Sequence, residues 1–191
     1  MKKVLGISGY IGSGKTFAGK YFESLGAFYI DADKIVNEIY KPGKDGYLKI
    51  VQFFGDQFLD EKELIDRSKL SEFVFGDSQK LKIVNKMIHP LVVNEIVKKV
   101  DKVNEGVVVV EAVYFDDDML GKIVDEILWI ECEISILRER ALKRGMSEDL
   151  FMMIVKSQRK PERVDYQVEN NSSNDEFETK LKEVWTLISK D

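Results

Sequence analysis

The sequence predicts an α/β protein in which a mostly parallel β-sheet is covered by helices. Short apolar runs alternate along the chain with segments whose apolar residues recur every three to four positions, as in amphipathic helices. Hydrophobic residues make up 44% of the 191 residues and charged residues 33%, a balance typical of soluble globular proteins. Because this length suits one domain, we expect residues 1–191 to form a single domain with inserted lobes.

Five apolar runs are the strand candidates. They are residues 4–8, 27–30, 107–110 and 127–130, with a weaker fifth run at 166–168. A helix is expected from Thr16 to Leu25, where Gly26 stops it. A last helix is expected from Asn174, because acidic residues follow in its first turn. These elements define an expected core of roughly residues 1–30, 104–134 and 164–191.

Two longer stretches interrupt this core. Residues 31–103 are too many for a simple crossover and predict an inserted helical lobe. Its helices are expected at 33–40, 46–54, 68–75, 77–88 and 91–103, with Pro90 in the first turn of the last one. Residues 135–163 predict a lid of two helical stretches, separated by Gly145 and Met146 and closed by Pro161.

Charge and rare residue types exclude several functions. Lys and Arg total 29 against 34 Asp and Glu, so the net charge is −5 and broad nucleic-acid binding is disfavoured. With Cys132 and His89 as the single residues of their types, disulfides, zinc ribbons and multi-histidine sites within the chain are excluded. Without an apolar run of about 20 residues, we expect no membrane partner. A cytoplasmic protein, monomeric or weakly homo-oligomeric, is the expectation.

A glycine loop carries the strongest functional signal. Residues 9–16 fit the pattern G-x-x-x-x-G-K-[ST], directly after the first strand and at the start of the first helix. Such a loop turns its amides around phosphate, while its lysine reaches the terminal phosphates and its hydroxyl ligates Mg²⁺. The nucleotide-binding residues are therefore expected to be Gly12, Ser13, Gly14, Lys15, Thr16 and Phe17, with Thr16 also on the metal. The alternative is a glycine-rich turn without a ligand.

This motif makes the predicted fold a P-loop NTPase-type three-layer fold, and ATP and Mg²⁺ the expected cofactors. Asp31 and Asp33 end the second strand, on the edge of the sheet where the loop also lies. One carboxylate there can take a proton from an attacking hydroxyl group. The alternative is that one of them only caps the helix that follows.

Arginine is concentrated in the predicted lid. Five of six arginines lie there, namely Arg138, Arg140, Arg144, Arg159 and Arg163. A guanidinium group binds phosphate oxygens in pairs, so this cluster favours a lid that closes on a transferring phosphoryl group. The alternative is a solvated helix face on which acidic residues pair with some of the arginines.

Taken together, the motifs resemble those of the dephospho-coenzyme A kinases over nearly the whole chain. The matching segments are residues 6–16, 30–35, 66–70, 73–75 and 88–92, followed by Gln158, Val164–Asp165 and Val168–Asn170. The chain departs from the family pattern at Tyr10, where a second glycine is usual, and at residues 112–116, where a Pro-Leu-Leu-Phe-Glu run is usual.

This resemblance implies transfer of the γ-phosphoryl group of ATP to the 3′-hydroxyl of dephospho-coenzyme A, the last step of coenzyme A synthesis. Asp33 would be the base, and Lys15 with Arg140 would stabilise the moving phosphoryl group. The further implied residues are Arg144 and Asn170 on the ATP side, and Asp31, Arg67 and His89 on the acceptor side. For His89, a purely structural role before a proline is the alternative.

Two rival functions remain open at this stage. One is another small-metabolite or nucleotide kinase on the same scaffold, which the segments of the inserted lobe disfavour. The other is a nucleotide switch that hydrolyses slowly. The sequence shows neither an Asp-x-x-Gly segment directly after a strand nor an Asn-Lys-x-Asp motif, and its third strand leads into Glu111 instead.

Overall fold

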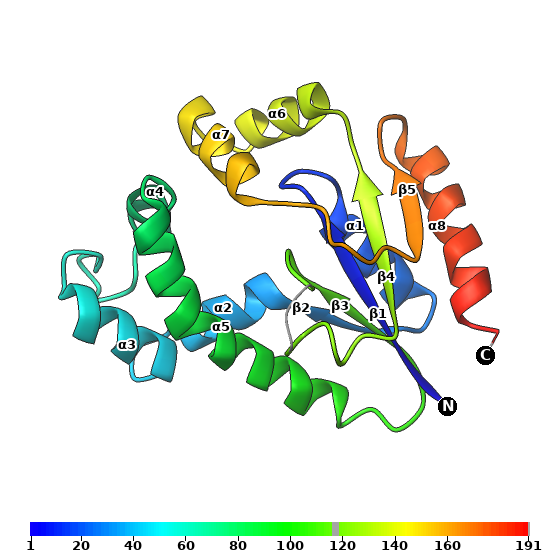
Figure 1. Cartoon of the computed structure of the whole chain (residues 1–191), viewed down its shortest axis with the longest axis horizontal. Coiled ribbons are helices and arrows are strands. Elements are labelled where there is room, and N and C mark those ends of the chain that lie inside the picture. The colour runs from blue at the N-terminus through cyan, green and yellow to red at the C-terminus, as the bar shows by residue number, and fades with distance from the viewer. Residues whose placement is uncertain (116–118, 191) are drawn as a thin grey trace. The chain divides into compact units, whose positions relative to one another are not determined.

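The computed structural model describes residues 1–115 and 119–190 (Figure 1). Asp116, the last residue of the run that departs from the family pattern, lies outside the described residues. The chain divides into two units, one formed by Met1–Asp31 with Val97–Asp191 and the other by Ala32–Ile96. We describe each unit by itself.

The first unit is built on a five-stranded sheet in the order β2-β3-β1-β4-β5. Its strands are β1 (Lys2–Gly9), β2 (Phe28–Asp31), β3 (Gly106–Glu111), β4 (Glu126–Glu131) and β5 (Tyr166–Glu169). Every pair of neighbours is parallel, with Ile7 opposite Glu111 and Asp31 opposite Glu111 at the carboxyl ends of their strands. The prediction of an α/β fold around a mostly parallel sheet is confirmed.

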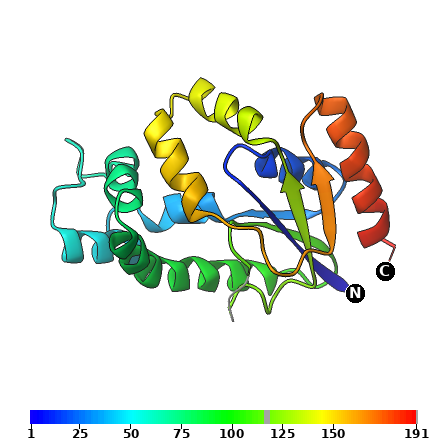
Figure 2. The same ribbon diagram turned by 45° about the horizontal axis from the view of Figure 1, so that its top comes forward.

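Two helices, α1 (Lys15–Ser24) and α8 (Asn174–Ile188), cover one face of this sheet (Figures 1 and 2). The central strands are apolar along most of their length because both of their faces are covered. Phe22, Phe177 and Leu181 enter the core on the helix side, and all three are almost fully buried. On the opposite face, the Phe115 ring lies so close to Gly6 that a Cβ atom there would come within 2.9 Å of it.

The predicted lid folds as two short helices, α6 (Ile134–Lys143) and α7 (Glu148–Ser157). Gly145 lies between them with a φ of +84°, a conformation that favours glycine. Ser147 caps α7 by accepting a hydrogen bond from the Leu150 amide at 3.3 Å. A small buried cluster that includes Leu137 and Phe151 holds the two helices together.

The second unit is helical. It contains α2 (Ala32–Ile39), α3 (Asp45–Phe54), α4 (Arg67–Phe75) and most of α5 (Ser78–Val100). Phenylalanine rings form its centre, with the Phe54 and Phe73 centroids 5.7 Å apart and Phe58 4.9 Å from Phe73. Asp66 caps α4 by accepting a hydrogen bond from the Lys69 amide at 3.0 Å.

The prediction of a helix break at Pro90 is wrong, since α5 runs without interruption from Ser78 to Val100. Proline has no N–H group, so the helix loses one backbone hydrogen bond there. It continues because an apolar stripe with a spacing of four residues runs along the buried side of the helix on both sides of the proline. The stripe comprises Val84, Ile88, Val92 and Ile96. Pro90 itself lies on the exposed side of the helix.

Within the part of the chain that the structure describes, no helix combines the length and the apolar character needed to cross a lipid bilayer.

If burial of this stripe overrides the proline, replacing Pro90 should strengthen the helix. We expect Pro90→Ala to raise the free energy of unfolding by about 1–3 kcal/mol, since alanine restores an N–H donor and has a higher helix propensity. Urea denaturation followed by circular dichroism measures the effect. Lys82→Ala, at another exposed position of α5, is the control; an equal change in both variants would show that the proline carries no penalty.

Candidate functional site

The loop between β1 and α1 has the conformation that its glycines permit. Gly12 and Gly14 have φ angles of +81° and +103°, which side chains other than hydrogen disfavour. A Cβ atom at Gly14 would overlap the side-chain amide of Asn170, and one at Gly12 would lie 3.1 Å from the Leu137 carbonyl oxygen. Both glycines are therefore required by close neighbours as well as by backbone geometry.

The loop directs amides towards a single region at the N-terminus of α1. The first hydrogen bond of the helix joins the Ala18 amide to the Gly14 carbonyl at 3.0 Å. The amides of Lys15, Thr16 and Phe17 precede this bond, so they have no acceptor within the helix. Together with the positive end of the helix dipole, they form a site suited to phosphate.

Lys15 folds back over the loop. Its Nζ donates to the carbonyl oxygens of Gly9 at 2.8 Å and Tyr10 at 3.0 Å. These contacts keep an ammonium charge at the loop, where it can act on a bound phosphate chain.

Ser13 supports the same interpretation. Its side chain is fully buried, and its Oγ is the one buried side-chain polar atom in the described ranges without a hydrogen-bond partner. A buried hydroxyl group without a partner is unfavourable. An orphaned polar atom inside a glycine loop fits a site shaped for a polar ligand.

A buried network joins the loop to the residue that follows the edge strand β5. Asn170 follows β5 directly, is 4% exposed, and donates from Nδ2 to the Ser13 carbonyl at 2.7 Å. Arg140 on α6 donates to the Gly12 carbonyl at 3.2 Å and to the Asn170 carbonyl at 3.2 Å. The guanidinium group also contacts the sulfur of Cys132 at 3.6 Å. Loop, lid and edge strand therefore share one set of hydrogen bonds.

Cys132 contributes to this network through hydrogen bonding and packing. Its thiol donates to the Asn170 carbonyl at 3.2 Å, and burial raises its pKa although Arg140 acts against the shift. A raised pKa keeps the sulfur protonated and unreactive at neutral pH. This agrees with packing and hydrogen bonding rather than thiol chemistry.

A second network lies at the carboxyl ends of β2 and β3. Glu111 is 5% exposed, and its Oε1 accepts a hydrogen bond from Thr16 Oγ1 at 2.9 Å. Its Oε2 accepts a hydrogen bond from the Tyr29 hydroxyl group. Burial raises the pKa of Glu111, and the Asp31 charge adds to this, whereas the two hydroxyl groups and Lys15 lower it. The loop threonine is thus paired with a buried carboxyl group.

These residues suit a hard cation that also contacts phosphate. Mg²⁺ favours oxygen ligands and usually binds through one or two protein groups, waters and phosphate oxygens. Thr16 and Glu111 supply such oxygens beside the phosphate loop. Among residues 1–115 and 119–190, no group of three or more His, Cys, Asp or Glu side chains could hold a metal on its own.

The remaining site candidates divide between the two units. In the second unit, Asp33 is exposed in the first turn of α2, and His89 is half-buried within α5. Arg67, the first residue of α4, donates to the Asn37 side chain of α2. In the first unit, Asp31 ends β2 beside Glu111.

The arginines of the lid have different surroundings. Arg138 forms an exposed ion pair with Glu148 at 2.6 Å, and Arg163 lies 3.4 Å from Asp165. Arg144 is exposed at the C-terminal end of α6. Acidic partners on the surface thus account for two of the five lid arginines, as the solvated-face alternative expects, while Arg140 is directed inwards to the loop.

Sequence reasoning missed three residues of the site. Glu111 follows an apolar strand on the same edge of the sheet as Asp31, so the argument applied to Asp31 could have found it. Gln158 accepts a hydrogen bond from the Ile11 amide in the loop at 2.8 Å, but was noted only as part of a family segment. Tyr29 gave no signal, because its role depends on a tertiary contact.

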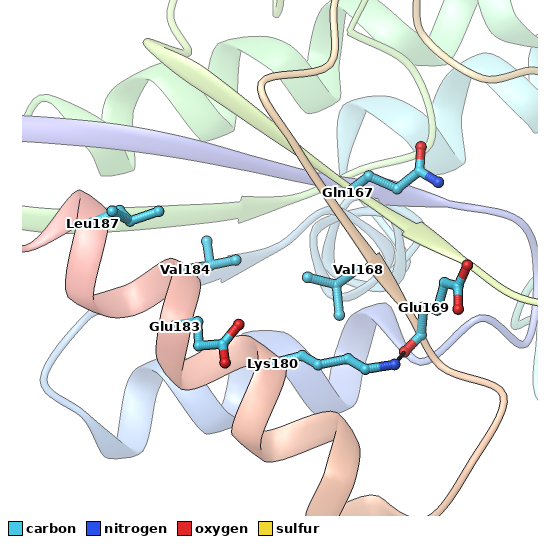
Figure 3. A pocket seen from close by; sticks show the side chains of 7 residues that line it. All are labelled: Gln167, Val168, Glu169, Lys180, Glu183, Val184 and Leu187. Atoms are coloured by element: carbon cyan, nitrogen blue, oxygen red, sulfur yellow. Dashed lines mark hydrogen bonds between the residues drawn. The ribbon is translucent and has the colours of Figure 1, made fainter.

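A groove of about 400 Å³ lies away from these residues, between β5 and α8 (Figure 3). Val168 and Val184 form its apolar floor, and Lys180 extends from α8 to the main chain of Glu169. Lys180 donates a hydrogen bond to a backbone carbonyl oxygen of the edge strand β5. A lysine at a sheet edge is a common way to prevent pairing with a strand of another molecule. None of the predicted site residues lines this groove.

Comparison with known proteins places these features in one family. The family model described as CoaE, dephospho-CoA kinase, matches residues 3–176. A dephospho-CoA kinase of Aquifex aeolicus is 33% identical over 194 residues, covering 99% of either chain. Among solved structures, TT1252 from Thermus thermophilus has a TM-score of 0.76 at 22% identity, with 98% of each chain covered. A dephospho-CoA kinase from Campylobacter jejuni has a TM-score of 0.62 at 23% identity, with 100% of this chain and 99% of the other covered.

The buried network predicts a stability effect at Asn170. We expect Asn170→Ala to lower the free energy of unfolding by about 1–3 kcal/mol, because the buried Ser13 carbonyl loses its donor. Chemical denaturation measures the change. Asn171→Ala is the matched control, since the neighbouring asparagine is exposed and accepts from the Glu133 amide. Equal losses in the two variants would contradict a special role for Asn170.

Proposed function

We propose, from the premise that this chain belongs to the dephospho-CoA kinase family, that it transfers the γ-phosphoryl group of ATP to dephospho-CoA. The acceptor is the 3′-hydroxyl of the ribose, and the product is CoA. The observation that carries this proposal is the glycine loop, whose amides and Lys15 converge beside the Thr16–Glu111 pair. Such a cradle suits a triphosphate with its cation.

In this proposal the loop binds the phosphates of ATP through Gly12, Ser13, Gly14 and the first amides of α1. Thr16 and Glu111 would hold Mg²⁺, which neutralises charge on the phosphate oxygens when it is bound. The Thr16 hydroxyl group can ligate a cation through an oxygen lone pair while it donates its hydrogen to Glu111. The two contacts are therefore compatible. The orphaned Ser13 hydroxyl group agrees with this use of the loop.

Lys15 and Arg140 would stabilise the transferring phosphoryl group. Both lie at the loop, with Arg140 3.2 Å from the Gly12 carbonyl oxygen. Arg140 donates to the carbonyl oxygens of Gly12 and Asn170 in this conformation, and its five N–H groups leave it able to bind phosphate oxygens as well. Preorganised donors of this kind are each worth roughly 3 kcal/mol of barrier. Arg144 and Asn170 complete the ATP side, the latter through the loop backbone.

Asp33 would act as the general base towards the acceptor hydroxyl, and Asp31 would bind the acceptor. We assign acceptor binding to the lobe of residues 31–103, with Arg67 and His89 as contacts, and closure over ATP to the lid of residues 135–163. The exposure of Asp33 and Arg67 leaves both side chains accessible to a ligand. We further propose that the enzyme is cytoplasmic and works as a monomer or weak homo-oligomer.

An acceptor panel with Mg-ATP tests this assignment against other kinases and against a slow hydrolase. It comprises dephospho-CoA, adenosine, nucleoside monophosphates, pantothenate and water alone. We expect ADP formation to depend on dephospho-CoA, with CoA as the product identified by mass. Equal turnover on another acceptor, or ADP formation with water alone, would contradict the proposal.

Asp33 provides the sharpest mutational test. We expect Asp33→Asn to retain its fold and ATP binding but to lower kcat by at least about 100-fold, the usual contribution of a general base. Steady-state kinetics with dephospho-CoA measures this. Glu38→Gln is the control, because Glu38 lies on the same helix and pairs only with exposed Lys41 in the described contacts. Near-normal turnover of Asp33→Asn would remove Asp33 from this role.

A further inference from the structure

Tyr29 occupies a position at the nucleotide site that the catalytic scheme does not use. Its hydroxyl group donates to Oε2 of Glu111, the carboxyl group whose other oxygen accepts from Thr16. Tyr29 therefore forms a hydrogen bond with a side chain that is itself an expected ligand of the cation. This observation is independent of the family motifs, which do not include Tyr29.

The backbone directs Tyr29 to this place. In β2, Tyr29 is paired with Val109 of β3, two residues before Glu111. Its ring lies against α1 at Gly19, where a Cβ atom would overlap the ring carbons. Only a residue without a side chain lets the ring reach across the helix. Gly19 and the register of β2 together set the position of the hydroxyl group.

The electrostatic surroundings explain why Glu111 needs such a donor. It is a buried carboxyl group with a second carboxylate, Asp31, opposite it in the sheet. Burial and the like charge both disfavour its ionised form, whereas hydroxyl donors stabilise that form. Two donors on two different oxygens also fix the plane of the carboxyl group.

We propose that Tyr29 is a positioning residue for the Mg²⁺–nucleotide site, holding Oε2 of Glu111 so that Oε1 stays aligned with the Thr16 hydroxyl group. The inference rests on the proposed function, because it assumes that Thr16 and Glu111 serve a cation bound with nucleotide. Tyr29 itself contacts neither substrate nor metal in this scheme. It acts through its hydrogen bond to Glu111.

Isothermal titration calorimetry with ADP, in the presence of Mg²⁺ and in the presence of EDTA, tests the proposal. The ratio of the two affinities measures how strongly Mg²⁺ supports nucleotide binding. We expect Tyr29→Phe to reduce this ratio about tenfold, the lower end of the effect of partners that orient metal ligands. The affinity in EDTA should stay at the wild-type value, because the loop amides and Lys15 are untouched.

Tyr166→Phe is the matched control. Its hydroxyl group also donates to a glutamate, Glu126, at 3.2 Å, but at the start of β4 and β5, away from the loop. The same atom is removed from the same kind of pair, so the Mg²⁺ ratio of this variant should equal that of the wild type. If both variants lower the ratio equally, or if Tyr29→Phe weakens ADP equally with and without Mg²⁺, the proposal is overturned.

A double-mutant cycle separates positioning from general damage. If Tyr29 acts through Glu111, Tyr29→Phe should change the ratio in the wild type but not in a Glu111→Ala background, which leaves the Tyr29 hydroxyl group without this acceptor. Independent, additive losses would overturn the proposal. Wild-type protein that binds ADP with the same affinity in Mg²⁺ and EDTA would instead refute the assumed cation site, and with it part of the proposed function. Thermal melting of each variant confirms that folded protein is compared.

Discussion

The site depends on one physical constraint, the conformation of the loop between β1 and α1. Its glycines adopt positive φ angles that are unfavourable for other residues. The buried side-chain amide of Asn170 donates a hydrogen bond to the Ser13 carbonyl of the loop. This buried bond fixes the Ser13 carbonyl and so restricts the orientation of the neighbouring peptide groups. Because Asn170 follows the edge strand β5, the loop geometry depends on correct assembly of the whole sheet.

The same sheet brings opposite charges to the loop from separate parts of the chain. The carboxyl ends of β2 and β3 supply Asp31 and Glu111, and the segment after β4 supplies Arg140. Parallel strands place all these ends at one edge. The buried carboxyl group of Glu111 would be unfavourable alone, and hydroxyl donors from Thr16 and Tyr29 stabilise it. Charged side chains and the hydroxyl groups that stabilise them therefore lie together where the phosphates and their cation are expected to bind.

Much of the fold could be predicted from local patterns. The apolar runs at 4–8 and 107–110 fall inside β1 and β3, because strands buried on both faces need continuous apolar residues. The helix break expected at Pro90 shows the limit of this reasoning. A proline weakens a helix locally, but burial of the stripe around Ile88 and Val92 outweighs one missing hydrogen bond. Propensity describes a segment by itself, whereas packing decides its conformation in the protein.

The sequence alone determined that a phosphate loop exists, because its glycines, lysine and threonine act through backbone geometry and spacing within eight residues. It also identified the family, through motifs spread along the chain. Only the tertiary structure decided which side chains support that loop. Tyr29 and Glu111 meet because of strand order and register, and Gln158 contacts the loop from the end of α7. Contacts of this kind depend on the positions of whole strands in space, which no local pattern records.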